Sequence, residues 1–319
     1  MTAEPDGRDD ASRRVRVAFI GGQGRSGSTV LENLLERLPG VVSVGEIRFL
    51  FSRGLEDNEL CGCGQPFQEC PYWREVIGLA LPDGFDRERI QRAVRSLNNV
   101  VRTPQLMYPR LLTPSLRADA KVYGDTFAAV FRTVRQVNDA RVIVDASKYP
   151  LHALFLQARP DIDLTAIHLV RDPRAVAYSW TRHKVRTEVH WEKREFKRHN
   201  VARTAVVWDV LNFLTRRLKS RSDAYRVVRY EDLVADPLEQ LRELAEFMLK
   251  RPTAIDDSLF GAQSRTPHTI SGNPSRVGGG AITVRADESW RQNLGGVKKA
   301  TVTALTAISL RRYGYDLAS

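Results

Sequence analysis

Residues 15–38, VRVAFIGGQGRSGSTVLENLLERL, constrain the fold more than any other part of the 319-residue chain. Residues 15–20 are almost continuously apolar and rich in β-branched side chains, which is typical of a buried strand. Four glycines follow between positions 21 and 27, and a helical pattern begins near Ser28. The order strand, glycine-rich turn, helix predicts the first unit of a parallel α/β sheet.

The glycine-rich turn has the composition of a phosphate-binding loop. Glycines allow positive φ and let backbone N–H groups point at an anion, while the N-terminus of the following helix adds partial positive charge. Arg25, Ser26, Ser28 and Thr29 supply side chains that hydrogen-bond phosphate. We therefore predict a phosphate site here, in preference to a turn that is glycine-rich for structural reasons alone.

The same loop lacks one residue that ATP and GTP hydrolases need. In a P-loop NTPase, a lysine stands where this chain has Ser28, and it reaches the β- and γ-phosphates beside magnesium. No residue of GRSGST replaces it at that position. The sequence therefore disfavours a nucleoside triphosphatase and is compatible with a nucleotide that has a shorter anionic arm on its 5′ side.

Four further strand patterns follow along the chain, at residues 41–44, 141–145, 164–170 and 224–230, and helical patterns separate them. Residues 85–138 hold several helical stretches without a strand. We expect one α/β domain over residues 15–319: a three-layer sandwich with a central parallel sheet of about five strands, helices on both faces and a helical cap at about 74–138. Residues 1–14 lack an apolar run and are expected to form a disordered tail.

The chain carries a net charge of +11 and 42% hydrophobic residues, enough for a full core. Residues 182–221 hold twelve Lys and Arg against four Asp and Glu. This segment is either a binding face for anions or nucleic acid, or the solvated side of a long helix, 201–218, whose basic residues face outward. No apolar segment approaches the roughly 20 residues of a membrane span, so we expect a soluble, cytoplasmic protein.

Three cysteines, Cys61, Cys63 and Cys70, fall within the segment LCGCGQPFQECPYW. An odd number of cysteines gives no disulfide framework. Zinc would need a fourth ligand, and no histidine or further cysteine lies nearby in the sequence. We therefore expect no metal site but reduced thiols in a turn-rich loop, with a redox-labile cysteine pair as the alternative.

A second candidate phosphate site lies in HLVRDPRAVAYSW, where a strand pattern ends at Val170 and Pro173 opens a helix. Arg171 at the carboxyl end of the strand and Ser179 on the helix are positioned for an anion in the crevice where such sheets bind ligands. Two phosphate sites indicate a bisphosphorylated nucleotide.

With both motifs in order, the sequence resembles the sulfotransferases that use 3′-phosphoadenosine 5′-phosphosulfate (PAPS). GRSGSTVLENLL resembles their 5′-phosphosulfate loop, VRDPRAVAYS their 3′-phosphate motif, and YEDLVADP a segment after a later strand. The resemblance extends from Val15 to about Leu294 and is nearest, in motif layout, to the bacterial and protein-tyrosine branches. It implies the P-loop-NTPase-like sulfotransferase fold.

The resemblance also implies which residues bind the donor. Arg171 and Ser179 correspond to the 3′-phosphate site, and Tyr230 to a tyrosine near the adenine. Sulfotransferases of this fold need no metal. The 5′ side is implied to be bound by Arg25, Ser26, Gly27, Ser28 and Thr29.

Two charged residues at strand ends are the main candidates for catalysis. Glu46 follows the strand pattern VVSV, and the protein-tyrosine branch uses a glutamate in this layout as general base; the alternative is a helix N-terminal residue favoured by the macrodipole. Lys148 follows VIVDAS, where relatives place a lysine that neutralises the leaving group; the alternative is an exposed loop lysine. We expect Arg25 to act with Lys148 in stabilising this charge. His152 is a second candidate base, by similarity to the cytosolic branch, or a helix-face histidine. His168, inside a strand pattern, is expected to be structural.

The late segment HTISGNPSRVGGG resembles a loop that closes over the donor in relatives. Ser271 is implied to take part in catalysis and Arg276 to reach the 3′-phosphate, although the cytosolic enzymes' RKG sequence is absent and a surface loop is the alternative. We expect sulfo transfer to a hydroxyl or amine of a small-molecule, glycan or lipid acceptor, with no nucleic acid partner. The alternatives are an atypical P-loop kinase and a non-enzymatic nucleotide or nucleic-acid binder.

Overall fold

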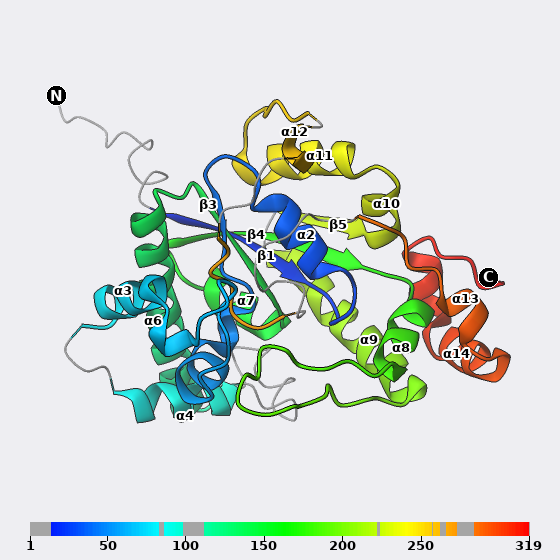
Figure 1. Cartoon of the computed structure of the whole chain (residues 1–319), viewed down its shortest axis with the longest axis horizontal. Helices are drawn as coiled ribbons and strands as arrows, with labels where there is room; N and C mark the ends of the chain where they lie inside the picture. The colour runs from blue at the N-terminus through cyan, green and yellow to red at the C-terminus, as the bar shows by residue number, and fades with distance from the viewer. Residues whose placement is uncertain are drawn as a thin grey trace.

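The computed structural model describes residues 14–82, 86–97, 112–221, 224–256, 258–261, 266–272 and 284–318. At its centre is a five-stranded sheet in the order β2-β3-β1-β4-β5, with every neighbouring pair parallel (Figure 1). All five predicted strands are present. They are β1 (Val15–Gly21), β2 (Val41–Ser43), β3 (Val142–Lys148), β4 (Ile162–Val170) and β5 (Tyr225–Arg229).

Helices fill the connections between strands, as parallel pairing requires. The α-helices of the described residues are α2 (Ser28–Leu35), α3 (Pro71–Ala80), α4 (Arg87–Leu97), α6 (Pro114–Asn138), α7 (Pro150–Gln157), α8 (Pro173–Thr181), α9 (Val201–Arg216), α10 (Tyr230–Ala235), α11 (Pro237–Leu249), α12 (Ser258–Gly261), α13 (Trp290–Asn293) and α14 (Gly296–Arg312). Short turns of other helix types are η1 (Ile47–Phe49), η2 (Leu50–Glu56), η3 (Phe67–Glu69) and η6 (Arg217–Arg221).

Side chains alternate along β1 and pack into two separate cores, one on each face of the sheet. Val17 and Phe19 join the core that includes α6 and α7, whereas Ala18 and Ile20 join the core that includes α2 and α11. Each strand therefore needs apolar residues at consecutive positions, which explains the continuous apolar runs in the sequence. The predicted three-layer α/β fold is confirmed.

The segment between β2 and β3 contains α3, α4 and α6, and no strand lies between these helices in the described residues. In Figure 1 the three helices lie together beside the sheet. Pro114 opens α6, and the Thr113 side chain accepts a hydrogen bond from the Leu116 N–H, so the long helix begins with a proper cap. The helical cap and the single-domain division stay predictions, and residues 1–13 of the expected tail lie outside the described residues.

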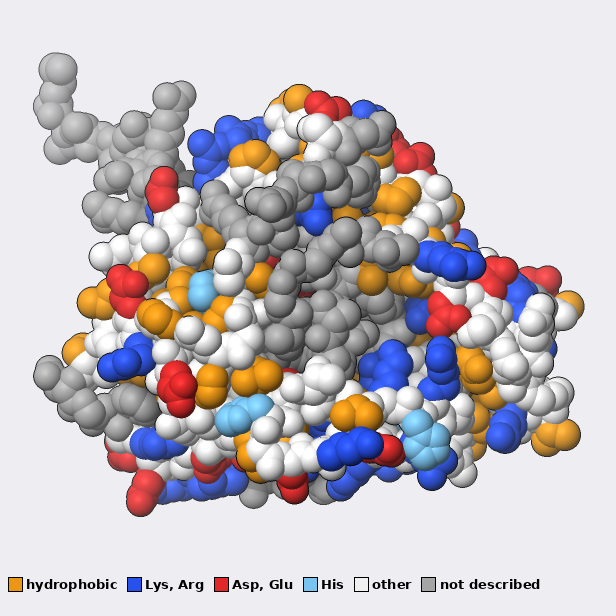
Figure 2. All heavy atoms as spheres, in the orientation of Figure 1, with side chains coloured by type: hydrophobic (Ala, Val, Ile, Leu, Met, Phe, Trp, Pro, Cys, Tyr) orange, Lys and Arg blue, Asp and Glu red, His pale blue; other side chains and the backbone are white. Residues whose placement is uncertain are grey.

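Helix α9 exposes apolar side chains in addition to the outward-facing basic residues that the sequence predicts. Ala205 and Trp208 are buried as predicted, but the outward side of the helix also carries Val206, Val210 and Phe213, which are about half exposed. The helix therefore has apolar side chains on more than one stripe. On the face drawn in Figure 2, Lys and Arg side chains stand in separate groups among acidic and apolar ones.

The helices of the described ranges contain no segment both long and apolar enough to span a bilayer.

His168 is fully buried in β4, where its two ring nitrogens lie 2.5 Å from the Tyr225 hydroxyl and 2.7 Å from Asn212 Oδ1. Burial lowers the pKa of His168 to about 4, so the ring is neutral at pH 7. These contacts agree with the structural role expected for this residue.

Candidate active site

The predicted glycine-rich turn is present and connects the carboxyl end of β1 to the N-terminus of α2. Gly22 and Gly27 have φ of 127° and 93°, and Arg25 adopts 74° between them, the left-handed region that glycine favours. A Cβ added to Gly27 would lie 2.2 Å from the Tyr230 ring. The side chain of Tyr230, at the end of β5, therefore packs directly on the glycine loop.

A cavity of about 400 Å³ opens beside this loop, and nine of the twelve predicted site residues line it. Six cationic and two acidic side chains face it among the described residues. The cations come from several separate parts of the chain. They are Arg25, Arg48, Arg53, Lys148, Arg171 and Lys184, and the acids are Glu46 and Asp287. This excess of positive charge suits a ligand with several negative charges.

Lys148 connects the loop to the candidate base. It is the last residue of β3 and adopts a left-handed φ of 62°. Its Nζ lies 2.8 Å from Glu46 Oε1 and 3.3 Å from the Ser28 hydroxyl, to which it donates a hydrogen bond. Ser28 stands where a P-loop NTPase has its lysine, so in this chain a lysine reaches the same place from a neighbouring strand.

The strand end that carries Lys148 is fixed by buried polar groups. The Asp145 carboxylate accepts hydrogen bonds from the Ser147 N–H and hydroxyl and lies 2.9 Å from His152 Nε2. His152 is buried, and its other ring nitrogen lies 2.6 Å from the Tyr123 hydroxyl. Both ring nitrogens of His152 are thus engaged inside the protein, and His152 is not among the described residues that line the cavity.

Glu46 lies just past the end of β2, next to Lys148. Its backbone N–H donates to the Ile270 carbonyl at 2.7 Å, which ties it to a segment more than two hundred residues later. Burial alone would raise the pKa of the Glu46 carboxyl, but the charges of Lys148, Arg53 and Arg48 outweigh burial and hold this pKa below its ordinary value. The side chain is therefore ionised at neutral pH.

Arg171 and Ser179 line the same cavity from β4 and α8. The Arg171 guanidinium donates to the carbonyls of Arg25 and Asp287 and lies 4.4 Å from the centre of the Tyr230 ring. A second hollow of about 590 Å³ also has Arg171, Tyr230 and Asp287 in its wall. These three residues therefore stand between the two hollows.

Helix α8 and the segment between α8 and α9 contribute residues that sequence reasoning missed. The Arg25 guanidinium lies 4.4 Å from the Phe196 ring centre and 5.2 Å from that of Trp180. Lys184 also faces the cavity, and burial followed by the charge of Arg25 lowers its pKa. The only signal in the sequence was the excess of basic residues after position 182.

Arg48 and Arg53 were also missed, although both reach the cavity beside Glu46. Arg48 lies in η1 and Arg53 in η2, a π-helical turn, and the direction of side chains in such turns is not given by a simple periodicity. Arg53 donates a hydrogen bond of 2.5 Å to the Ser271 hydroxyl. Ser271 thus touches the site through Arg53, while Arg276 lies outside the described residues.

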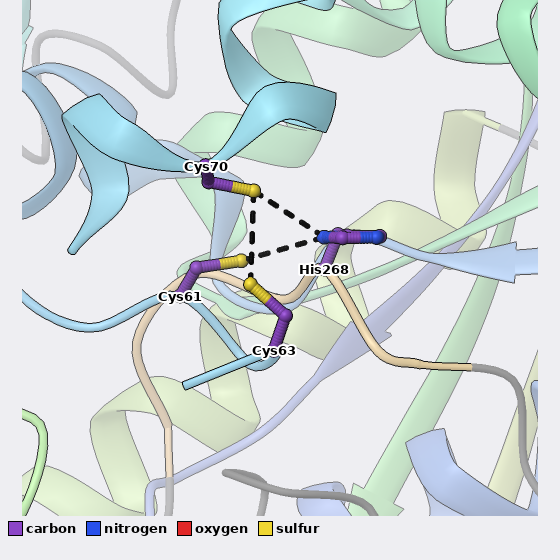
Figure 3. A group of neighbouring side chains, drawn as sticks. All are labelled: Cys61, Cys63, Cys70 and His268. Atoms are coloured by element: carbon purple, nitrogen blue, oxygen red, sulfur yellow. Dashed lines mark hydrogen bonds between the residues drawn. The ribbon is translucent and has the colours of Figure 1, made fainter. Parts of the chain in front are cut away.

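One expectation about the cysteines needs correction. Cys61, Cys63 and Cys70 have a fourth potential metal ligand beside them, His268, and all four ligand atoms lie within 4.8 Å of one another (Figure 3). The sequence alone predicts no zinc site, because no histidine lies near these cysteines along the chain. His268 comes from the late segment that runs beside Glu46, 198 residues after Cys70.

Several solved structures of bacterial sulfotransferases are similar to this chain. Solved structures with a similar fold include the sulfotransferase domain of the olefin synthase from Synechococcus PCC 7002, with a TM-score of 0.53, 24% identity and coverage of 95% of this chain and 96% of that one. A sulfotransferase from Mycobacterium avium gives a TM-score of 0.45 at 13% identity, covering 97% of this chain and 80% of that one. One from Alicyclobacillus acidocaldarius gives 0.36 at 15%, covering 94% and 96%.

Comparison with curated proteins gives no match. The sequence profile of the Sulfotransferase family matches residues 18–249, which include the glycine loop, both strand-end charges and the Arg171 motif. A family match over most of the chain supports a transferase of the sulfo-transferring type. The chain belongs to the Sulfotransferase family.

Proposed function

We propose that this protein transfers a sulfo group from PAPS to a hydroxyl or amine of an acceptor and releases 3′,5′-ADP. The observation that carries the proposal is the position of Lys148, whose Nζ lies between the Ser28 hydroxyl of the glycine loop and the Glu46 carboxylate. A charge stabiliser for the donor and a base for the acceptor thus meet at one point of a strongly cationic cavity.

The residues of the cavity suit a donor with two phosphate-bearing ends. The glycine loop and Arg25 lie at one side, and Arg171 and Ser179 line the other. The Ser26 hydroxyl is buried and has no hydrogen-bond partner in the described part of the chain, so an anion bound at the loop could satisfy it. The ring of Tyr230, held against the loop, offers a flat apolar surface for a purine.

The donor, when bound, supplies a sulfo group: its sulfur forms a bond to the acceptor oxygen or nitrogen while its bond to the bridging phosphate oxygen breaks. The Glu46 carboxylate takes the proton that the acceptor loses. Lys148 and Arg25 neutralise the negative charge that builds up on the departing phosphate. Ser271 has an indirect part in this scheme, because its hydroxyl holds Arg53 beside Glu46.

The ion pair between Lys148 and Glu46 gives the base a way to respond to the donor. Lys148 is the strongest of the charges that lower the pKa of Glu46, while burial acts in the opposite direction. When Lys148 turns toward a bound phosphate, Glu46 keeps its burial but loses its nearest counter-charge. Its pKa then rises, so the carboxylate becomes a stronger base once the donor is in position.

Thermal unfolding with different nucleotides tests the donor. We expect 3′,5′-ADP to raise the melting temperature without magnesium. At a concentration of 100 times its dissociation constant, it should add about 2.7 kcal/mol to the free energy of unfolding. 5′-AMP, which lacks the 3′-phosphate, is the matched control and should bind more weakly. Stabilisation by ATP with magnesium and none by 3′,5′-ADP would instead indicate a kinase and contradict the proposal.

Incubation with PAPS tests the reaction itself. A panel of sugar, lipid head-group, phenol and peptide-tyrosine acceptors should contain one that gains the mass of one sulfo group in the presence of the protein. Binding of 3′,5′-ADP with no transfer to any acceptor, together with salt-dependent binding to nucleic acid, would favour the non-enzymatic alternative.

A further inference from the structure

We propose that Cys61, Cys63, Cys70 and His268 form a structural zinc site. Figure 3 shows the three sulfurs and the His268 ring converging from four points of the backbone. Cys61 and Cys63 lie in a turn, Cys70 is the residue before α3, and His268 belongs to the late segment 266–272. The four ligand atoms lie within 4.8 Å of one another.

Three of the six separations between the ligand atoms match the edges of a tetrahedral zinc site. Zinc bonds of roughly 2.3 Å to sulfur and 2.0 Å to nitrogen give tetrahedron edges of about 3.8 Å between sulfurs and about 3.5 Å between sulfur and nitrogen. Cys63 Sγ lies 3.7 Å from Cys70 Sγ. His268 Nδ1 lies 3.8 Å from Cys61 Sγ and 3.4 Å from Cys70 Sγ.

The turn that carries the first two cysteines is already shaped for such a site. The Cys61 N–H donates to the Gln65 carbonyl and the Gly64 N–H donates back to the Cys61 carbonyl, at 2.8 and 2.9 Å. Gly64 has a φ of 87°, which glycine adopts without strain. This tight turn brings the Cys61 and Cys63 sulfurs to the same side.

The histidine is held by contacts that fix the plane of its ring. Tyr72 stacks on the His268 ring at 4.5 Å with an interplanar angle of 12°, and Trp73 Nε1 donates to the His268 carbonyl at 3.0 Å. The Tyr72 hydroxyl in turn accepts a hydrogen bond from Asn138 Nδ2. Orienting contacts of this kind around a ligand histidine tune metal affinity.

The two segments that bring the ligands together leave no room for another side chain. The Gly62 N–H donates to the Thr269 carbonyl at 3.0 Å. A Cβ on Gly62 would lie 2.6 Å from Thr269 Oγ1 and 2.7 Å from the Pro267 carbonyl oxygen. A disulfide between two cysteines would use only half of this cluster and would leave the position of His268 unexplained.

Four protein ligands with three thiolates favour zinc and leave no open coordination position, so the proposed role is structural. Its effect reaches the candidate active site through the chain. Two residues after His268, the Ile270 N–H donates to the Val44 carbonyl and its own carbonyl accepts from the Glu46 N–H. The metal would therefore anchor the segment that holds the backbone of Glu46.

Zinc content and cobalt spectra test the proposal on the full chain. Protein purified without chelators should contain about one zinc per chain, and Cys63→Ser and His268→Asn should each lose at least about tenfold in zinc affinity. His183→Asn removes an exposed histidine, 65% accessible, and is the matched control that should keep its zinc.

Cobalt substitution of the wild-type chain gives a second test that does not depend on variants folding. The metal-free chain titrated with Co²⁺ should give the intense visible absorption of tetrahedral cobalt bound to thiolates. Chain without zinc that gives no such absorption with Co²⁺ would overturn the proposal, as would three reduced thiols that remain equally reactive with and without Zn²⁺. A disulfide that forms between two of these cysteines whether or not zinc is added would favour the redox alternative. This result would also overturn the proposal.

Discussion

The glycine loop and the cysteine cluster solve the same problem of positioning ligand groups in different ways. The loop takes its donors from one short stretch after β1, where backbone geometry alone sets their direction. The cluster takes Cys61, Cys63 and Cys70 from one segment and His268 from another, so it exists only once the late segment packs against the earlier one. One site depends on local conformation, whereas the other reports that distant parts of the chain have come together.

Glu46 lies in the candidate active site, and its backbone is hydrogen-bonded to the segment that carries His268. We expect the largest loss of activity when this residue is substituted. Glu46→Gln keeps the size and burial of the side chain but cannot take the acceptor proton, so we expect the rate of sulfo transfer to fall by about 10²–10⁴-fold. Affinity for 3′,5′-ADP and zinc content should stay the same. Kinetics, titration calorimetry and metal analysis measure the three quantities.

The control for this variant is Glu239→Gln, an acid with about half its side chain exposed on α11. It should leave all three quantities unchanged. Full transfer activity in Glu46→Gln would remove Glu46 from the proposed mechanism. Loss of zinc in the same variant would show that the two regions are not separable.

The next largest effect is expected for Lys148→Met. Loss of one charge that stabilises the leaving group should lower the transfer rate by about 10²–10³-fold. Burial raises the pKa of Glu46, and removing Lys148 takes away the strongest charge that lowers it, so this pKa rises from its value in the unmodified protein. Activity needs the ionised carboxylate and is lost as pH falls through this pKa; the acid limb of the pH–rate profile should therefore move to higher pH in the variant.

Lys121→Met is the control, because Lys121 is 75% exposed on α6 and forms an exposed ion pair with Asp125 in the i,i+4 position. Its pH–rate profile should coincide with that of the unmodified protein. A Lys148→Met profile with an acid limb at unchanged or lower pH would contradict the coupling between Lys148 and Glu46.

Gly27→Ala tests the local construction of the loop and should have a smaller effect. The new Cβ would stand 2.2 Å from the Tyr230 ring at a φ of 93°, a conformation that costs a non-glycine residue about 1–3 kcal/mol. We expect lower stability in urea and weaker binding of 3′,5′-ADP, with zinc content unchanged. Unaltered nucleotide affinity would show that the loop does not bind the donor.

The matched substitution Gly78→Ala should change stability least and in the opposite direction. Gly78 lies inside α3, and a Cβ there meets nothing within 4 Å. Alanine should stabilise the helix by about 0.5–1 kcal/mol, without changing nucleotide binding or zinc affinity. A destabilised Gly78→Ala chain would show that α3 tolerates less change next to the cysteine cluster than the structure indicates.

The sequence predicted the fold and the loop because both depend on local patterns. Consecutive apolar residues mark strands buried on both faces, and glycines before a helix mark an anion site. Glu46 and Lys148 could also be found, because the carboxyl ends of parallel strands meet at one edge of the sheet. Residues approaching from irregular turns could not be found: Arg48 and Arg53 come from short helical turns, and His268 lies 198 residues beyond Cys70.

Strand β2 is an edge of the sheet, and Ile270 pairs in parallel with Gly45 just beyond its carboxyl end. The backbone groups of Val44 and Glu46 are thereby satisfied within the chain rather than offered to a neighbour. Unpaired edges are templates for self-association. If the late segment detached, this edge of the sheet would be exposed, and we expect the protein to self-associate there. The contact made by Ile270 would then protect solubility as well as the shape of the site.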